Sequence, residues 1–368
     1  MSGLSLRVLN VLKGWLKTGF LALLLVTLSV GLCAAGVSRL PQGNAITDGK
    51  ALLRYSLPID NQQVRDLQES LEDISQQLRR KRWGAINGDL KKAARIVGDR
   101  QSDLLASVPD DQKPQAEALI SQISESLDSL KAAAEAKSKP ELLDQSSNVL
   151  NLVGELEEYM VGEFPFEVPA QYSNLPQLKG RATVKMTTEK GDLILVLDGY
   201  SAPVTAGNFV DLVQRGFYNG LPFTRAEESY VLQTGDPPGK EQGFIDPKTN
   251  EYRAIPLEIL VQGDEAPTYG ITLEQAGRYR DLPVLPFSAY GAVAMARPES
   301  EVNGGSSQFF FFLFEPELTP AGLNLLDGRY SIFGFVTEGK DVLGKLKQGD
   351  KIESATVIKG AENLVQPS

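Results

Sequence analysis

The chain has 368 residues, of which 37 are basic and 47 acidic, and its formal net charge is -10. This acidic balance argues against nucleic acid as a partner, because contacts to phosphates need a basic face. The sequence contains no histidine and a single cysteine, Cys33. These counts exclude a histidine general base, a Cys-His nucleophile pair and a thiolate zinc site, so neither a metal nor a cofactor is expected. The length favours two domains, each able to bury its own core.

The first 36 residues are typical of an export signal. An apolar to weakly polar run extends over residues 19–37, and three basic residues precede it: Arg7, Lys13 and Lys17. The small residues Cys33 and Ala35 favour cleavage before Gly36, which would remove three bases and no acids and leave a net charge of -13. The run is also long enough to remain as a membrane anchor. Either outcome predicts an exported protein.

The first half of the chain predicts an α-helical domain. Residues 37–59 are interpreted as an extended lead-in and residues 60–163 as an up-and-down bundle of four helices. Apolar residues of the first helix recur at spacings of three and four: Val64, Leu67, Leu71, Ile74 and Leu78. This stripe favours the inner face of the chain's own bundle over a zipper for another protein. Asp60 and Gln63 are expected to form a capping box at its start.

Three more helices are expected in this half. The second covers residues 86–105, the third residues 111–137, and the fourth begins near Ser138. The basic cluster at residues 79–82 has two interpretations. It is either a docking patch for an acidic partner or lipid surface, or a solvated helix end that complements the helix dipole. Trp83 is expected to pack between helices.

Prolines within residues 164–180 mark a linker, after which the pattern changes to strands. A hairpin is expected from residues 183–187 and 193–197, followed by a helix over residues 205–215. A long Pro- and Gly-punctuated insertion covers residues 237–286, and its length favours a functional role. The insertion predicts a strand at residues 255–260 and a short helix near 273–279. The remaining expectations are strands at 292–296, 308–314, 331–336 and 354–358, a helix over 340–347, and a tail at 361–368.

Two distant stretches of the second half carry the chemistry. In residues 222–236 (PFTRAEESYVLQTGD), a strand leading into a turn could aim Arg225, Tyr230 and Gln233 at one shallow groove. Residues 303–314 (NGGSSQFFFFLF) contain enough aromatic residues to line such a groove and fill a core behind it. Because side chains alternate along a strand, half of this run enters the core.

Together with PVTAGNFVDLVQRGFYNG at residues 203–220 and LDG at 326–328, these stretches resemble the cyclophilin family of peptidyl-prolyl isomerases. The resemblance covers residues 181–360 and implies a closed antiparallel β-barrel with two helices. It implies that Arg225 is the catalytic arginine and that Gln233 orients this arginine and the substrate backbone. It also implies substrate-binding roles for Tyr230, Val231, Ala296, Phe310, Leu325, Leu326 and Tyr330. Taken alone, Arg225 has a plainer interpretation as one half of a surface salt bridge.

Prolyl isomerisation suits a chain without histidine. Amide resonance imposes a barrier of about 18–20 kcal/mol on rotation of the peptide bond. An arginine that donates to the prolyl nitrogen as it becomes pyramidal weakens the partial double bond, and this interaction is stronger in the twisted state than in either planar state. Each 1.36 kcal/mol of such preference gives about a tenfold rate increase. The reaction therefore needs no acid, base, metal or cofactor.

The sequence departs from the family pattern at several groove positions. Leu325 stands where many cyclophilins have tryptophan, Tyr330 where they have histidine, and Arg297 where they have asparagine. Val231 replaces a usual methionine and Tyr230 a usual phenylalanine. These differences predict a shallower or reshaped proline pocket.

An export signal, an acidic helical bundle and a divergent cyclophilin-like domain together resemble the large thylakoid-lumen cyclophilins of photosynthetic organisms. This resemblance implies a folding or assembly factor for photosystem II in the thylakoid lumen, with Pro-containing clients, contact between bundle and barrel, and membrane contact only through the N-terminal segment. A periplasmic location is the alternative. Two other functions stay open: a catalytically weak binding module whose groove is covered by its own bundle, and a bundle that does the work while the barrel regulates it.

Overall fold

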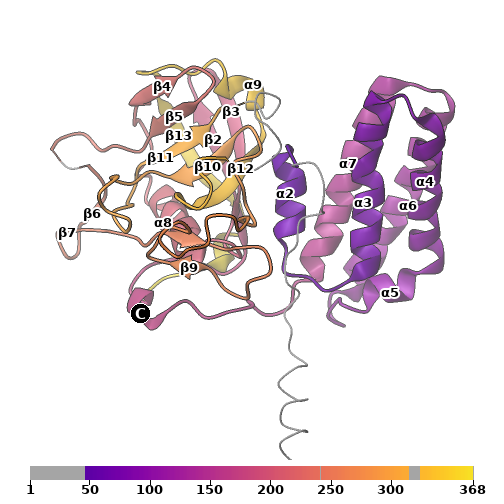
Figure 1. Cartoon of the computed structure of the whole chain (residues 1–368), viewed down its shortest axis with the longest axis horizontal. Helices are drawn as coiled ribbons and strands as arrows, with labels where there is room; N and C mark the ends of the chain where they lie inside the picture. The colour runs from indigo at the N-terminus through magenta and orange to yellow at the C-terminus, as the bar shows by residue number, and fades with distance from the viewer. Residues whose placement is uncertain (1–45, 241, 315–323, 368) are drawn as a thin grey trace, which may run out of the picture. The chain divides into compact units, whose positions relative to one another are not determined.

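The computed structural model describes residues 46–240, 242–314 and 324–367 (Figure 1). The expected export signal at residues 1–36 lies outside these ranges. Across the ranges that are described, no helix combines the length and the apolar character that a membrane crossing requires.

The N-terminal half is helical, as the sequence predicts. Its helices are α2 (Gly49–Ser56), α3 (Gln62–Arg79), α4 (Trp83–Asp99), α5 (Gln101–Leu105), α6 (Lys113–Glu135) and α7 (Lys139–Tyr159). Helix α3 packs against α4 and α7, and α6 packs against the same two helices. Their apolar faces form one core, which contains the whole α3 stripe from Val64 to Leu78 and is flanked by Trp83. The stripe is therefore the inner face of this helical region.

Three details of this half differ from the expectation. Residues 49–56 form α2, where an extended lead-in was expected, because Asp48 caps the helix and the sheet buries Leu52 and Leu53. A helix this short depends on such tertiary contacts, which sequence periodicity does not reveal. The expected second helix is divided at Arg100 into α4 and α5. The N-cap of α3 is Asn61, whose side chain accepts a hydrogen bond from the Val64 amide at 3.1 Å, so the expected capping box is wrong.

The C-terminal half contains an eight-stranded antiparallel sheet with the order β13-β2-β3-β12-β10-β11-β5-β4. The strands are β2 (Arg181–Thr188), β3 (Gly191–Asp198), β4 (Arg225–Glu227), β5 (Val231–Thr234), β10 (Ala292–Met295), β11 (Phe309–Phe312), β12 (Ile332–Glu338) and β13 (Ile352–Lys359). Helix α8 (Pro203–Gln214) packs against one face of the sheet, and the short helix α9 is Lys340–Leu343. Phe209 of α8 lies 5.0 Å from Phe309 and 5.2 Å from Phe333, measured between ring centroids, at the centre of this core.

The expected closed barrel is wrong, because the sheet is an open half-barrel. Its edge strands β13 and β4 are not paired with each other within the described residues. The chain before β4 approaches the start of β13 through one isolated bridge, between Pro222 and Lys351. Backbone hydrogen bonds flank this bridge on both sides, from the Phe223 amide to the Asp350 carbonyl oxygen at 2.8 Å and from the Ile352 amide to the Leu221 carbonyl oxygen at 3.0 Å. The gap lies next to β4, which carries Arg225.

Short strands occupy segments where a linker, an insertion and a tail were expected. In the linker, β1 (Gln177–Leu178) pairs with β14 (Leu364–Val365) of the tail. The insertion holds two small hairpins, β6 (Ile245–Asp246) with β7 (Glu251–Tyr252) and β8 (Glu258–Ile259) with β9 (Thr268–Tyr269). Residues 273–279 form turns in place of the expected helix, and Gly277, with φ of 72°, interrupts them.

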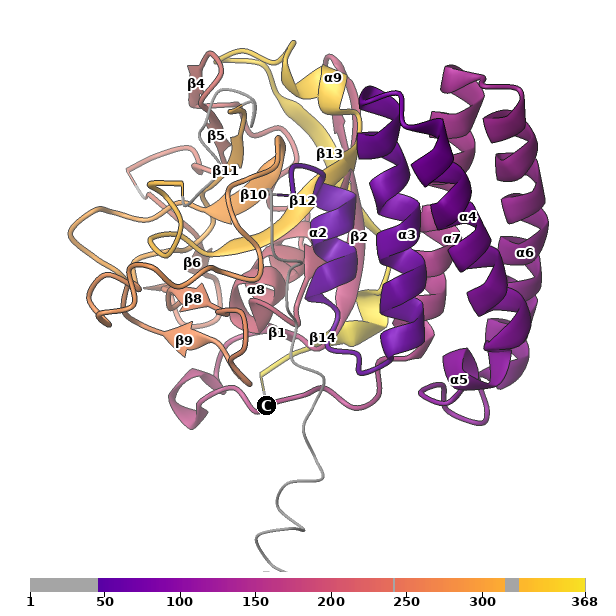
Figure 2. The same cartoon turned by 45° about the vertical axis from the view of Figure 1, so that its right-hand side comes forward.

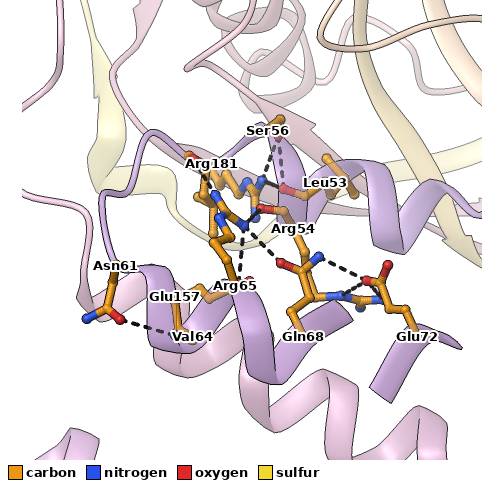
Figure 3. Close-up of polar contacts among 11 residues, drawn as sticks. Leu53, Arg54, Ser56, Asn61, Val64, Arg65, Gln68, Glu72, Glu157 and Arg181 are labelled. Atoms are coloured by element: carbon orange, nitrogen blue, oxygen red, sulfur yellow. Dashed lines mark hydrogen bonds and ion pairs between the residues drawn. The ribbon is translucent and has the colours of Figure 1, made fainter. Parts of the chain in front are cut away.

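Helix α2 lies beside β12 (Figure 2) and joins the helical region to the sheet. At this junction, Arg181 donates to the carbonyl oxygen of Leu53 and to Ser56 Oγ at 3.0 Å (Figure 3). It also donates to Asp198 Oδ1 at 3.1 Å. Arg65 donates from Nη1 to Glu157 Oε1 at 3.2 Å on the helical side. The N-terminal half thus contacts the cyclophilin-like half through the apolar residues Leu52 and Leu53 of α2 and through the partly buried Arg181.

Candidate active site

Three adjacent strands bring the predicted catalytic residues together. Arg225 of β4 lies opposite Gln233 of β5, and Gln233 lies opposite Phe310 of β11. Side chains of directly opposed residues in an antiparallel pair point to the same face of a sheet. The guanidinium, the amide and the phenyl ring therefore share one face, although 85 positions separate Arg225 from Phe310 in the sequence.

Arg225 pairs with one side chain among the residues that the structure describes. Its Nε and Nη2 atoms both donate to Glu227 Oε1, at 2.7 Å and 2.6 Å, and its side chain is 50% exposed. A guanidinium has five N–H donors, so this pairing leaves capacity for a substrate. The plainer interpretation of Arg225 as part of a surface salt bridge is thus compatible with its position at the groove.

A chain of side-chain hydrogen bonds orients Gln233. Its Nε2 donates to Gln308 Oε1 at 2.8 Å, and Gln308 Nε2 donates to Asp236 Oδ1 at 3.0 Å. Partial burial raises the pKa of the Asp236 carboxyl. The sequence analysis assigned no role to Gln308 or Asp236. Both lie within the two stretches named there, but the sequence does not show that their side chains are hydrogen-bonded to each other.

The apolar wall of the predicted groove is aromatic. Phe310 is buried, its ring stacks on Phe287 with a centroid separation of 6.0 Å and an interplanar angle of 2°, and its edge meets Tyr330 at 5.5 Å. Val231 belongs to the same buried cluster. Ala296, Leu326 and Tyr330 pack against it as partly buried residues. Phe287 was missed, because it lies at the end of the insertion and no strand pattern marks it.

Two groove positions differ in their exposure from the rest of the wall. Tyr230 is 37% exposed and its ring lies 6.3 Å from Phe312, so it borders the wall at the rim. Leu325 is 87% exposed and lies outside the cluster, so the structure does not bring it to the wall. The position where many cyclophilins have tryptophan contributes no aromatic surface here.

Arg297 covers one end of the wall. Its guanidinium carbon lies 5.1 Å from the centroid of the Tyr330 ring, a cation–π distance. Its Nε and Nη2 donate to the carbonyl oxygen of Arg329, at 3.1 Å and 3.0 Å. A second cation therefore lies at the Tyr330 end of the groove, in addition to Arg225 at the β4 end.

Two buried carboxyl groups, Asp327 and Glu258, form hydrogen bonds that connect the insertion and the loop around Asp327 to neighbouring segments. Asp327 accepts from the Phe287 amide at 2.7 Å, which holds the ring behind Phe310, and burial raises the pKa of Asp327 to about 6. Glu258 of β8 accepts from the amides of Val204 and Thr205, at 3.0 Å and 2.7 Å, and thus caps α8. Burial raises the pKa of Glu258 to about 7. The insertion is therefore integral to the cyclophilin-like half.

This arrangement suits a reaction driven by binding and electrostatics. The half-exposed guanidinium of Arg225 is on β4, the ring of Phe310 is on β11, and the oriented amide of Gln233 is on β5 between them. An apolar wall can hold a proline ring while the guanidinium donates to the nitrogen of the twisting bond, which favours the transition state over both planar states. No titrating group has to change its charge in this scheme.

Comparison with known proteins gives matches for both halves of the chain. Residues 48–161 match the family described as peptidyl-prolyl cis-trans isomerase CYP38-like, PsbQ-like domain, and residues 183–363 match cyclophilin type peptidyl-prolyl cis-trans isomerases. A Synechocystis sp. protein that carries the name thylakoid lumen peptidyl-prolyl cis-trans isomerase is 57% identical over 95% of this chain and 95% of its own length. The chloroplastic isomerase CYP38 of Arabidopsis thaliana is 44% identical over 90% of this chain and 78% of its own length. CYP37 of the same plant is 35% identical over 87% and 71%.

The resemblance inferred from the sequence motifs is confirmed by these matches, which extend over both halves of the chain. The chain belongs to the cyclophilin-type peptidyl-prolyl cis-trans isomerase family, with a CYP38-like, PsbQ-like helical domain before its cyclophilin domain.

Proposed function

We propose that this protein isomerises prolyl peptide bonds in Pro-containing segments of client proteins. The observation that carries this function is the register of Arg225, Gln233 and Phe310 across β4, β5 and β11. It places a hydrogen-bond donor, an orienting amide and an apolar wall on one face of the sheet. These are the three components that lowering the barrier to amide rotation requires.

In the proposed mechanism, the proline ring lies against Phe310, where Phe287 supports the wall from behind. Gln233, oriented by Gln308, binds the substrate backbone. Arg225 leaves Glu227 and donates to the prolyl nitrogen as its lone pair becomes localised. Tyr230, Val231, Ala296, Leu326 and Tyr330 contact the segment around the proline, and Leu325 would have to move inward to take part.

The location and clients form a finer part of this proposal. The names of the Synechocystis and Arabidopsis relatives support a thylakoid lumen location for this protein. The PsbQ-like domain supports clients among the subunits of photosystem II. In this proposal, residues 1–36 are the export segment, cleaved or kept as an anchor, and membrane contact occurs only through them. The helices of residues 60–163 form an up-and-down bundle, residues 164–180 a linker, and residues 181–360 the isomerase domain.

A weakly active binding module is the second candidate. It is supported by the engagement of Arg225 with Glu227 and by the exposure of Leu325, which leaves the wall without an aromatic residue at that position. Masking of the groove by the N-terminal half is supported by Leu52 and Leu53 of α2, which belong to the same apolar cluster as Phe310. Next to Phe287, Ser288 Oγ donates to the carbonyl oxygen of Ile46 at 2.6 Å.

The test is the rate of cis–trans isomerisation of a proline tetrapeptide catalysed by the full chain. Arg225→Ala should lower kcat/KM about 10²-fold, the loss typical when one preorganised donor is removed. The matched control is Arg100→Ala, which removes another exposed arginine that pairs with a nearby carboxylate, Asp103. An active Arg225→Ala variant would contradict the proposed mechanism. Peptide binding without catalysis in the unaltered chain would favour the binding module.

A further inference from the structure

Glu227 occupies a position in β4 from which it can act on the groove. It lies two residues after Arg225, and strand alternation places both side chains on the same face. Glu227 is directly opposite Val231, as Arg225 is opposite Gln233. Val231 belongs to the apolar cluster that contains Phe310. The carboxylate is therefore part of the border of the groove.

The ion pair between these two residues is close but easily exchanged. One oxygen of Glu227 accepts from both Nε and Nη2 of Arg225, at 2.7 Å and 2.6 Å. The two side chains are 50% and 48% exposed, respectively. Exposed pairs of this kind typically contribute about 0–1 kcal/mol, because solvent screens them and ordering two long side chains costs entropy. An incoming charged group can therefore replace either partner.

The two arginines of the site differ in their partners. At the β4 end, the Glu227 carboxylate neutralises Arg225. At the other end, Arg297 lies over Tyr330, and its guanidinium donates to the backbone carbonyl oxygens of Arg329 and Pro298. A cationic residue of a client is thus best accommodated at the β4 end. An acidic residue placed there would meet Glu227 as a like charge and would compete with the prolyl nitrogen for Arg225.

We propose that Glu227 is a positioning and specificity-determining residue that selects clients with a lysine or arginine beside the proline. In the resting state it holds Arg225. When a basic client residue binds the Glu227 carboxylate, the guanidinium is released for the prolyl nitrogen. This inference rests on the proposed isomerase function and adds to it a class of substrate.

The test uses the full chain and three tetrapeptides that differ only in the residue before the proline, which is lysine, alanine or glutamate. We expect kcat/KM to be about five- to tenfold higher for the lysine peptide than for the glutamate peptide at low salt. Glu227→Gln should reduce this ratio to below about twofold and raise kcat/KM for the alanine peptide about two- to fivefold, the range that an exposed pair allows. High salt should reduce the ratio in the unaltered chain, because exposed charges are screened.

Glu228→Gln is the matched control, since it removes a neighbouring exposed carboxylate that lies in the turn after β4. This variant should keep the preference for lysine. A ratio that Glu227→Gln leaves unchanged, or that Glu228→Gln abolishes equally, would overturn the assignment. Arg225→Ala separates this result from the proposed function. If Arg225→Ala loses activity while Glu227→Gln leaves the ratio unchanged, only the client selectivity is refuted. If Arg225→Ala keeps its activity, the isomerase mechanism itself is refuted.

Discussion

Arg181 and Arg225 are each the first residue of a strand in the same sheet, yet they lie in opposite environments. The Arg181 side chain is 12% exposed and donates to Asp198, Ser56 and the carbonyl oxygen of Leu53. The Arg225 side chain is 50% exposed and has one carboxylate partner, Glu227. The first arginine has acceptors from the sheet and from α2, whereas the second is paired within its own strand.

This difference separates a structural arginine from the predicted catalytic one. Removal of a buried cation leaves its buried carboxylate partner unpaired, which strongly destabilises the fold. An exposed pair can exchange its contacts with solvent at little cost in free energy. Arg181 can therefore hold the helical region against the sheet, and Arg225 can change partners during a reaction. The comparison predicts that substitutions at the two sites affect different properties.

The largest expected effect is a loss of stability in Arg181→Ala. Asp198 is fully buried and would lose its cation, so we expect the free energy of unfolding to fall by about 3–5 kcal/mol in urea denaturation. The exposed control Arg100→Ala should change it by less than about 0.5 kcal/mol. Should Arg181→Ala fail to fold, Arg181→Met with Asp198→Asn removes both charges and should recover part of the loss. A decrease below about 1 kcal/mol for Arg181→Ala would show that the junction does not depend on this residue.

A smaller effect is expected from pH at the same junction. Burial raises the pKa of Glu157 to about 7, against the opposing attraction of Arg65, Arg54 and Arg181 and with some help from Glu72. A folded pKa above the ordinary value of 4.5 means that the folded state holds the proton more tightly. The stabilising contribution is therefore complete below about pH 4.5 and is lost as the pH rises through about 7.

Glu157→Gln isolates this contribution, because glutamine does not titrate. Between pH 5 and 8, we expect the free energy of unfolding of the unaltered chain to fall relative to that of the variant by at most about 3 kcal/mol. Glu141→Gln, at an exposed position of α7, should retain the pH profile of the unaltered chain. Identical profiles for the unaltered chain and Glu157→Gln would contradict the assigned titration.

The smallest effect on stability is expected from Arg225→Ala. Because the pair with Glu227 is half exposed, the free energy of unfolding should change by less than about 0.5 kcal/mol, as urea denaturation can measure. The same variant should lose isomerase activity. A stability loss above about 1.5 kcal/mol would place Arg225 in the structural class with Arg181 and remove the contrast between them.

Local sequence patterns anticipated much of the fold and the site. Alternation correctly divided the phenylalanine run between two faces: Phe309 and Phe311 lie in the core beside α8, and Phe310 and Phe312 in the cluster on the other face. The expectation that only half of the run is buried is wrong, because all four rings are buried. The hairpin of β2 and β3 and the helix α8 were also anticipated, with slightly different ends. These features depend on neighbours within a few residues, which a single sequence displays directly.

Features that depend on distant partners were missed. Helix α2 packs against β12, and the edge strands β13 and β4 do not pair with each other within the described residues. The stacking of Phe287 on Phe310 likewise joins the insertion to a strand that lies beyond it. Nothing in the local pattern at residues 49–56 or at Phe287 specifies these contacts.

The most direct test of the central claim is where the proline ring of a bound peptide lies on the full chain. Nuclear Overhauser contacts between the ring protons of an Ala-Pro peptide and the aromatic protons of the protein would report it. We predict contacts to Phe310 and to Tyr230 at the rim, together with a shift of the Arg225 Nε–H signal. Contacts to the helical region instead, or binding that leaves Phe310 and Arg225 unchanged, would contradict the assignment of this groove as the proline site.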